Sequence, residues 1–139
     1  MTQHGFTLVE SLIVLTILGL MFISTVPGLV SVHHQWKLYG AANELAAELE
    51  RVRVRAVLAN MEIRVKTGAN QYSIEQSDLE SRLIPLGSGL SFAGSPKTVL
   101  FTPHGTATPG VTLTLSYRSG RVCVIVSPAG RVRLAEPRP

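Results

Sequence analysis

One long apolar stretch near the N-terminus constrains this chain more than any other feature. Between Ser11 and Gln35 there is no Asp, Glu, Lys or Arg, and most of the residues are Leu, Ile, Val, Phe or Met. A helix through this stretch would rise by about 37 Å, which is enough to cross a hydrocarbon core of about 30 Å. We therefore expect one membrane-spanning helix, followed by about 100 residues that can form one small domain.

The stretch differs from a secretory signal peptide, which has a basic start, a shorter apolar core and an A-x-A-like cleavage site. Residues 1–5 contain no Lys or Arg, and an acidic residue, Glu10, lies at the start of the apolar run. An acidic residue within a membrane-spanning segment costs roughly 2.5–3.5 kcal/mol on insertion scales, so it usually has a partner and a function. The alternative is that Glu10 lies hydrated at the membrane boundary.

The residues after the apolar stretch have an interfacial and then an amphipathic composition. Trp36 and Tyr39 are of the aromatic types that are enriched at membrane boundaries. Apolar residues then recur at spacings of three and four over residues 37–60, which predicts an amphipathic helix. Pro27-Gly28 is expected to kink the chain. Residues 6–60 are thus predicted to form one long helix, apolar in its first half and amphipathic in its second.

The spacing of apolar residues changes to two after residue 60, as is typical of strands. Strands are expected at 63–65, 72–74, 99–101, 111–115, 122–126 and 131–134, with turns at 67–70, 117–120 and 127–130. Residues 122–126 are apolar on both faces, which predicts a central strand. Residues 76–97, punctuated by Pro and Gly, are expected to be irregular. The predicted fold class is α+β, in which a long N-terminal helix packs on an antiparallel sheet over residues 61–135.

Positive charge gathers in the last third of the chain. Residues 1–96 hold 7 basic and 8 acidic residues, whereas residues 97–139 hold 6 basic residues and only Glu136 as an acid. Such a region suits a polyanion such as DNA or anionic lipid, and the alternative is a solvated basic face.

No catalytic constellation is present in the sequence. There is no H-E-x-x-H, no G-x-S-x-G and no Walker-type loop. His33 and His34 diverge on a helix, and His104 has no evident second ligand, so neither predicts a metal site. Cys123 is alone, which excludes an internal disulfide, and its apolar strand predicts a small core residue. We expect no catalytic residue, no metal and no cofactor, and hence a protein that is not an enzyme.

The sequence Gly5-Phe6-Thr7-Leu8-Val9-Glu10 closely resembles the processing motif of type IV pilins and type II secretion pseudopilins. In that family a membrane peptidase cuts after the glycine and methylates the new terminal amine, which implies cleavage between Gly5 and Phe6 and methylation of Phe6. The resemblance also implies that Glu10 pairs with the Phe6 amine of a neighbouring subunit during filament assembly. Pro27 falls where the family commonly carries a proline.

This resemblance implies three regions of the chain: a leader at 1–5, a transmembrane and assembly helix at 6–32, and a periplasmic pilin-like domain at 33–139. It implies a single-pass protein of the bacterial inner membrane whose C-terminal domain is periplasmic before assembly into a pilus or pseudopilus. The implied partners are the prepilin peptidase, the inner membrane and other pilin-type subunits that pack through the N-terminal helix.

The later part of the chain resembles the GspH/FimT group of minor subunits. The matching elements are residues 53–60, Phe101-Thr102-Pro103-His104-Gly105, the strand at 111–115 and Gly130-Arg131-Val132-Arg133. Members of the GspH type are minor pseudopilins of type II secretion, the system that exports folded proteins. Members of the FimT type belong to type IV pilus systems, and some bind DNA for natural transformation through a Gly-Arg-x-Arg element.

Two functional hypotheses therefore stay open. The first is a minor pseudopilin, a structural component of the type II secretion pseudopilus. The second is a FimT-type minor pilin that binds double-stranded DNA through Arg131 and Arg133. These arginines are two apart on a predicted strand, so both should face one side and could contact phosphates. The residues that could assist them are Arg118, Arg121 and Arg138. A charge-protected edge strand is the structural alternative, and a plain bitopic membrane protein is a third possibility.

Overall fold

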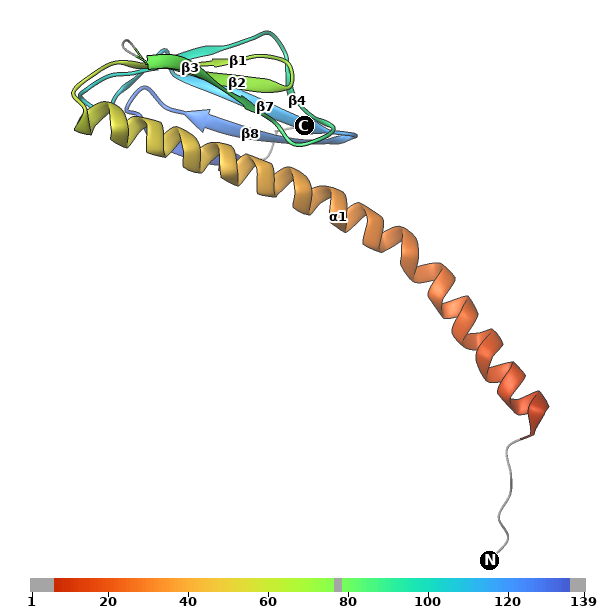
Figure 1. Cartoon of the computed structure of the whole chain (residues 1–139). Coiled ribbons are helices and arrows are strands. Elements are labelled where there is room, and N and C mark those ends of the chain that lie inside the picture. Colours follow the sequence, from red (N-terminus) through yellow and green to blue (C-terminus); the bar gives the residue numbers. More distant parts are fainter. Residues whose placement is uncertain (1–6, 77–78, 136–139) are drawn as a thin grey trace, which may run out of the picture. The chain divides into compact units, whose positions relative to one another are not determined.

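The computed structural model describes residues 7–76 and 79–135, with the side chains of residues 23–31 and 79–80 outside that description. Over these residues one helix, α1 (Leu8–Leu58), precedes the strands (Figure 1). The strands are β1 (Ile63–Thr67), β2 (Gln71–Gln76), β3 (Leu79–Pro85), β4 (Leu90–Ala93), β5 (Thr98–Phe101), β6 (Ala107–Thr108), β7 (Val111–Tyr117), β8 (Gly120–Val126) and β9 (Val132–Ala135). The chain separates into two compact units between His33 and His34.

Local hydrogen bonds define both ends of α1. Thr7 precedes the helix, and its Oγ1 accepts a hydrogen bond from the backbone N–H of Glu10 at 3.2 Å, as an N-cap side chain does. At the other end, Asn60 adopts a left-handed φ of 50°. The N–H of Met61 donates to Ala56 O at 3.1 Å and that of Asn60 donates to Val57 O at 3.3 Å. This pair of bonds is a Schellman motif, which ends the helix at Leu58, two residues before the predicted end.

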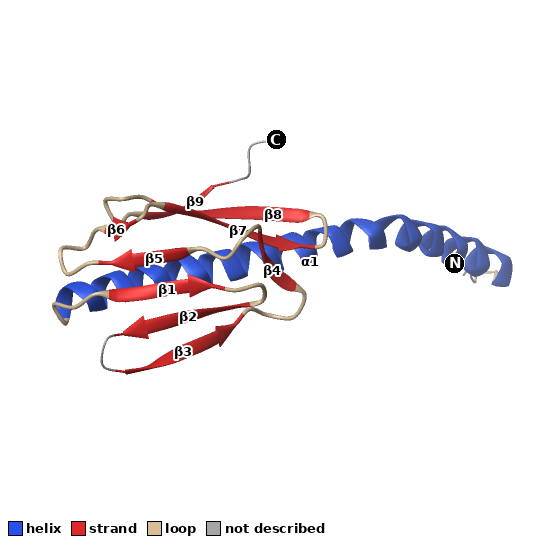
Figure 2. Cartoon of the chain, turned by 90° about the horizontal axis from the view of Figure 1, so that it is seen from above, coloured by secondary structure: helices blue, strands red, loops and turns tan. Residues whose placement is uncertain are grey.

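Nine strands of the described chain form two antiparallel sheets beside the second half of α1 (Figure 2). The first sheet has the order β3-β2-β1-β5-β6, and the second has the order β4-β7-β8-β9. The long hairpin β7–β8 pairs Val111 with Val126 at one end and Tyr117 with Gly120 at the other. The α+β prediction of a helix packed on antiparallel strands is therefore confirmed.

The core lies between α1 and both sheets. The helix contributes a buried stripe whose members are spaced alternately by four and three residues: Leu38, Ala42, Leu45, Leu49, Val52 and Ala56. The strands contribute alternate residues, as in Ile63 and Val65 of β1 and Val122, Val124 and Val126 of β8. Phe101 of β5 is fully buried at the centre. Burial of these side chains at about 25 cal/mol per Å² of apolar surface drives the helix onto the sheets.

The prediction of an irregular segment at residues 76–97 is wrong, because this segment contains β3 and β4. Strand β3 is an edge strand that pairs only with β2, and its Leu83 is 60% exposed. An edge strand that buries little needs no alternating apolar residues, so its sequence carries no strand pattern. Strand β4 is short, and its only buried residue is Leu90.

The C-terminal strands follow the prediction with two differences. Strand β8 is central in its sheet, as expected, but the prediction that Cys123 is a core residue is wrong. Val122 and Val124 take the buried positions, and Cys123 lies half-buried on the other face, with its Sγ 3.5 Å from Thr114 Oγ1. Strand β9 begins at Val132, so Arg131 belongs to the turn before it.

Candidate functional site

The first candidate site is the N-terminal part of α1, whose apolar side chains are uncovered. Within residues 8–22 the large apolar side chains are between 44% and 81% exposed, from Leu18 to Leu8. Such a contiguous apolar surface marks a site of association with a membrane or another protein. Gly5 and Phe6, the predicted cleavage and methylation sites, lie outside the described residues.

Glu10 lies in the first turn of this helix and is exposed. Its backbone N–H donates a hydrogen bond to Thr7 Oγ1. The sequence Thr7-x-x-Glu10 also has the pattern of a capping box. An acidic side chain also interacts favourably with the positive end of the helix dipole. The structure thus gives Glu10 a local role at the helix start, beside the intersubunit role that the resemblance implies.

The helix continues through Pro27 and Gly28 as part of α1. The predicted kink at these residues stays a prediction. Among the described residues, no helical segment reaches the combination of length and hydropathy that a membrane span requires.

The second candidate site is the turn and edge strand that carry Arg131 and Arg133. Both side chains are exposed, while Val132 and Leu134 between and after them pack against the core. Arg133 pairs with Ile125 of β8, so it lies on the outer face of the sheet. Arg131 and Arg133 were predicted to lie on one strand and share a face, but only Arg133 belongs to β9, so their shared face stays a prediction. Strand β9 is also an edge strand, as the structural alternative requires.

A close junction holds the base of this turn. Gly130 has a φ of 78° and is buried, and a Cβ placed on it would overlap the carbonyl oxygen of Gly105. The Arg53 Nε of α1 donates a hydrogen bond to that same carbonyl at 3.0 Å, and Arg53 also pairs with Glu50 at 2.7 Å. The glycine of the Gly-Arg-x-Arg element is therefore required by backbone geometry and packing.

The other predicted DNA-binding residues lie elsewhere. Arg118 is at the tip of the β7–β8 turn, with a φ of 54°, and Arg121 follows at the start of β8. Arg133 is paired with Ile125 of β8. Ile125 lies five residues from Gly120, at the turn, so Arg133 is about 17 Å from the turn at 3.3 Å per residue. Arg138 lies outside the described residues. The arginines thus divide between the two ends of the hairpin, and they do not form one cluster.

The described part of the chain shows no cluster of metal-ligating side chains. No group of three or more His, Cys, Asp or Glu residues converges within residues 7–76 and 79–135. Tyr72 of β2 is 5% exposed, and its burial, helped by the negative charges of Glu48 and Glu44, raises the pKa of its phenol to about 12. The phenol stays protonated at neutral pH and serves as a core side chain.

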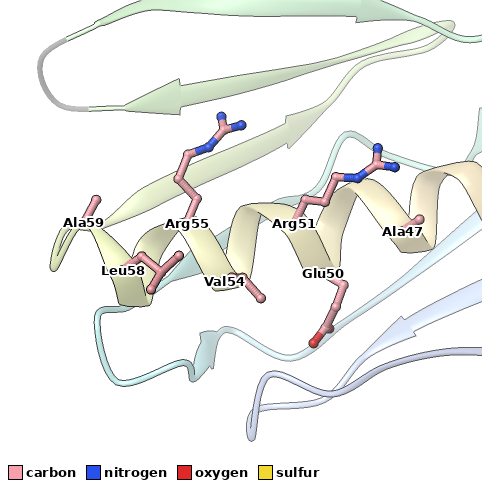
Figure 3. Close-up of a pocket in the computed structure, with 7 residues that line it drawn as sticks. All are labelled: Ala47, Glu50, Arg51, Val54, Arg55, Leu58 and Ala59. Atoms are coloured by element: carbon pink, nitrogen blue, oxygen red, sulfur yellow. The ribbon is translucent and has the colours of Figure 1, made fainter.

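Sequence analysis missed an uncovered patch on the outer face of α1 near its end (Figure 3). Val54 is 48% exposed and Leu58 is 82% exposed, on the side of the helix away from the buried stripe. Arg51 and Arg55 extend from one edge of the patch and Glu50 from the other. The patch is lined by Ala47, Glu50, Arg51, Val54, Arg55, Leu58 and Ala59. A helical wheel would have located this patch, because it places Val54 and Leu58 on the face opposite the buried stripe.

Comparison with family models identifies the family to which the chain belongs. Residues 41–130 match the model of type II transport protein GspH, and residues 1–26 match the prokaryotic N-terminal methylation motif. The chain belongs to the GspH family. Its assignment as a type IV pilin-like protein of the GspH/FimT group is therefore confirmed.

Solved structures agree with this family in fold. Two crystal forms of the type IV minor pilin FimU from Pseudomonas aeruginosa strain PAO1 are similar, with TM-scores of 0.59 and 0.55 and identities of 24% and 28%. The matches cover 74% and 72% of this chain, and 90% and 93% of FimU. The minor pseudopilin EpsH from the type 2 secretion system of Vibrio cholerae has a TM-score of 0.59 and 17% identity, over 73% of this chain and 98% of EpsH. No curated protein matched the chain significantly.

The GspH match ends at Gly130, the residue that closes the junction with Gly105 and Arg53. All three junction residues thus lie in the part of this GspH-family chain that matches the family model. The two arginines that follow, Arg131 and Arg133, lie beyond the matched residues. Sequence analysis named both glycines as parts of motifs but did not find that they meet, and Arg53 carried no signal of its own.

Proposed function

We propose that this chain is a minor pseudopilin, a structural subunit of the type II secretion pseudopilus that takes part in protein export. It is held in the bacterial inner membrane by residues 6–32 until assembly, with residues 33–139 in the periplasm. Prepilin peptidase removes residues 1–5 and methylates Phe6. The mature subunit then joins other pseudopilins through its N-terminal helix, with Glu10 and Pro27 taking part in that assembly.

The observation that carries this proposal is the uncovered apolar surface of residues 8–22, on a chain whose domain matches the GspH model. A surface of this size is costly in water, so it needs an apolar environment. A membrane supplies it before assembly, and the helices of neighbouring subunits supply it afterwards. Beyond these exposed residues, the absence of charge up to Gln35 supports the anchor.

Processing of the leader tests the pseudopilin assignment directly. In cells that contain a prepilin peptidase, we expect the mature chain to lack the mass of residues 1–5 and to carry one extra methyl group on Phe6. A Gly5→Val chain should keep the leader completely, because the bulky side chain replaces the residue at the cleaved bond. Intact mass spectrometry distinguishes these forms, with Gln3→Ala as the control that should still be cleaved. A wild-type chain of full unprocessed mass would support the plain bitopic membrane protein instead.

A second candidate function, DNA binding by a FimT-type minor pilin, is favoured by one observation. Arg131 and Arg133 are exposed on an edge of the sheet, and the sequence contains no Asp or Glu between residues 81 and 135. A phosphate backbone approaching this edge would meet positive charge without a competing carboxylate in that part of the chain.

Double-stranded DNA affinity of the region from His34 onward, measured by fluorescence anisotropy over a salt series, tests this function. If it is correct, an Arg131→Gln/Arg133→Gln variant should bind more weakly, and its slope of log affinity against log salt should fall by about 2, since each lost phosphate contact contributes roughly 0.9. The matched control is Arg64→Gln/Lys66→Gln, which removes the same charge from β1, where both residues already face Glu75. Equal losses of affinity in the two variants, or no binding at low salt, would overturn the DNA-binding function and leave the pseudopilin as the one remaining proposal.

A further inference from the structure

The β7–β8 turn lies against the start of the helix within the unit that begins at His34. The rings of His34 and Tyr117 meet edge to face, with centroids 5.6 Å apart. Lys37 Nζ lies 4.8 Å from the centroid of the Tyr117 ring, a cation–π distance, and donates a hydrogen bond to Ser88 O at 2.9 Å. Three segments that are distant in the sequence therefore meet at this end of the domain.

Two glycines allow this close packing. A Cβ on Gly89, whose φ is 79°, would lie 2.9 Å from the Tyr117 ring, and a Cβ on Gly120 would lie 3.0 Å from Leu38. The turn is thus held firmly against the helix. Its tip presents Arg118, which is exposed. We call the surface formed by His34, Lys37, Tyr117 and Arg118 the Tyr117 end.

The Tyr117 end combines the half-buried rings of His34 and Tyr117 with the basic side chains of Lys37 and Arg118. The sequence has no Asp or Glu between residues 11 and 43 or between residues 81 and 135, so every segment that builds this end is free of acids. Aromatic rings beside Lys and Arg are the composition of a membrane–water interface.

We propose that the Tyr117 end binds the headgroups of anionic phospholipids and seats the domain on the membrane surface before assembly. This inference rests on the proposed membrane anchor. His34 follows residue 32, the end of the proposed anchor, by two residues, and two residues span at most about 7 Å. The headgroup layer is itself about 5–7 Å deep on each side of the hydrocarbon core. His34 and the Tyr117 ring that contacts it are therefore within reach of the headgroups.

Lipid fits the Tyr117 end better than DNA does. Arg118 lies at the opposite end of the β7–β8 hairpin from Arg131 and Arg133, so the three arginines do not form one cluster for a phosphate backbone. The aromatic side chains also have a natural place at a membrane interface, where one part of the ring is apolar and the other is wet.

Hydrogen exchange of the full chain in nanodiscs tests the inference. The deuterium uptake of a peptide containing residues 117–120 is compared in phosphatidylcholine nanodiscs with and without phosphatidylglycerol. We expect slower uptake at the turn in the anionic nanodiscs, and recovery of fast uptake in high salt, which screens exposed charges. Arg118→Gln should lower the ratio of docked to free domain about fivefold, the effect of one basic residue near an anionic surface.

Two further variants separate charge from folding. Arg118→Lys keeps the charge at the same left-handed position and should keep the protection, whereas loss in both variants would overturn the charge-based inference. Arg133→Gln removes an exposed arginine about 17 Å away along the hairpin and should change nothing at the turn.

The remaining outcomes distinguish this inference from the proposal on which it rests. Co-elution with the nanodiscs without slower uptake at the turn would overturn the lipid surface alone. Failure to co-elute would overturn the anchor, and the lipid surface with it. The last control adds inorganic phosphate or a DNA duplex to the chain in nanodiscs of phosphatidylcholine alone. If either slows uptake at the turn as much as phosphatidylglycerol does, the Tyr117 end binds a soluble anion or nucleic acid instead.

Discussion

A Glu10→Ala chain is expected to be cleaved and methylated normally but to enter the pseudopilus poorly, with incorporation reduced about tenfold or more. Removing a carboxylate from an apolar segment lowers the cost of membrane insertion, so anchoring and processing should not suffer. Assembly should suffer if Glu10 pairs with the Phe6 amine of the neighbouring subunit, as the resemblance implies, because that amine would then lose the carboxylate that neutralises it. Incorporation is measured as the fraction of the subunit in sheared filaments, and processing is measured by intact mass.

The structure supplies the control for this experiment. Glu10 contributes its backbone N–H to the Thr7 cap, and alanine keeps that N–H, so the hydrogen bond to Thr7 Oγ1 survives and only the carboxylate at the helix start is lost. A Thr7→Ala chain loses the cap and about 1 kcal/mol of helix stability, but it keeps the carboxylate. If Glu10 acts between subunits, Thr7→Ala should assemble far better than Glu10→Ala. Equal defects would instead attribute the effect to the start of the helix, and normal secretion by Glu10→Ala would remove its assembly role.

A Gly130→Ala substitution is expected to destabilise the domain by about 4 kcal/mol, a fall of about 20 °C in Tm. Two causes add at this position. The left-handed φ of 78° is strained for any residue with a Cβ, and that Cβ would overlap Gly105 O and lie 2.8 Å from Arg53 Nε. Relief requires the β8–β9 turn to move away from the end of α1. Urea and thermal unfolding of the region from His34 onward, followed by circular dichroism, measure the loss.

Gly94 is the matched control, because it separates strain from overlap. Its φ of 96° is also left-handed, but a Cβ there would have no atom within 4 Å. Gly94→Ala should therefore cost only the backbone strain, about 1 kcal/mol. Similar losses at the two positions would show that the junction with Gly105 and Arg53 contributes little to stability.

The sequence predicted those parts of the fold whose residues alternate between water and core. The Leu38–Ala56 stripe is visible as a spacing of three to four residues, and the alternation in β1 and β7 is visible as a spacing of two. Strand β3 was missed because it is a polar edge strand, whose backbone pairs with β2 while its Leu83 stays in water. Cys123 was misplaced because a strand that is apolar on both sides does not reveal which side is deeper.

The candidate site was predictable only where one short motif contains it. The motif at residues 5–10 predicts the processing residues and Glu10 without any tertiary information, and Arg131 and Arg133 likewise lie within one short element. The junction and the Tyr117 end each join three segments, and nothing local to Arg53 or Lys37 indicates a partner some 50 residues away. Contacts of this kind follow from the topology, which periodicity does not provide.

The junction at Gly130 also bears on when this domain can become native during synthesis. Arg53 bonds to a residue 52 positions further on, and Gly130 completes the contact close to the end of the chain. Pairings of such high sequence separation form late, since the entropy of closing the intervening loop is lost before the contact forms. Even if the proposed anchor inserts into the bilayer early, the end of α1 near Arg53 stays without this contact until residue 130 has been made. The contact of the β8–β9 turn with the end of α1 can therefore form only after residues up to Gly130 have been synthesised.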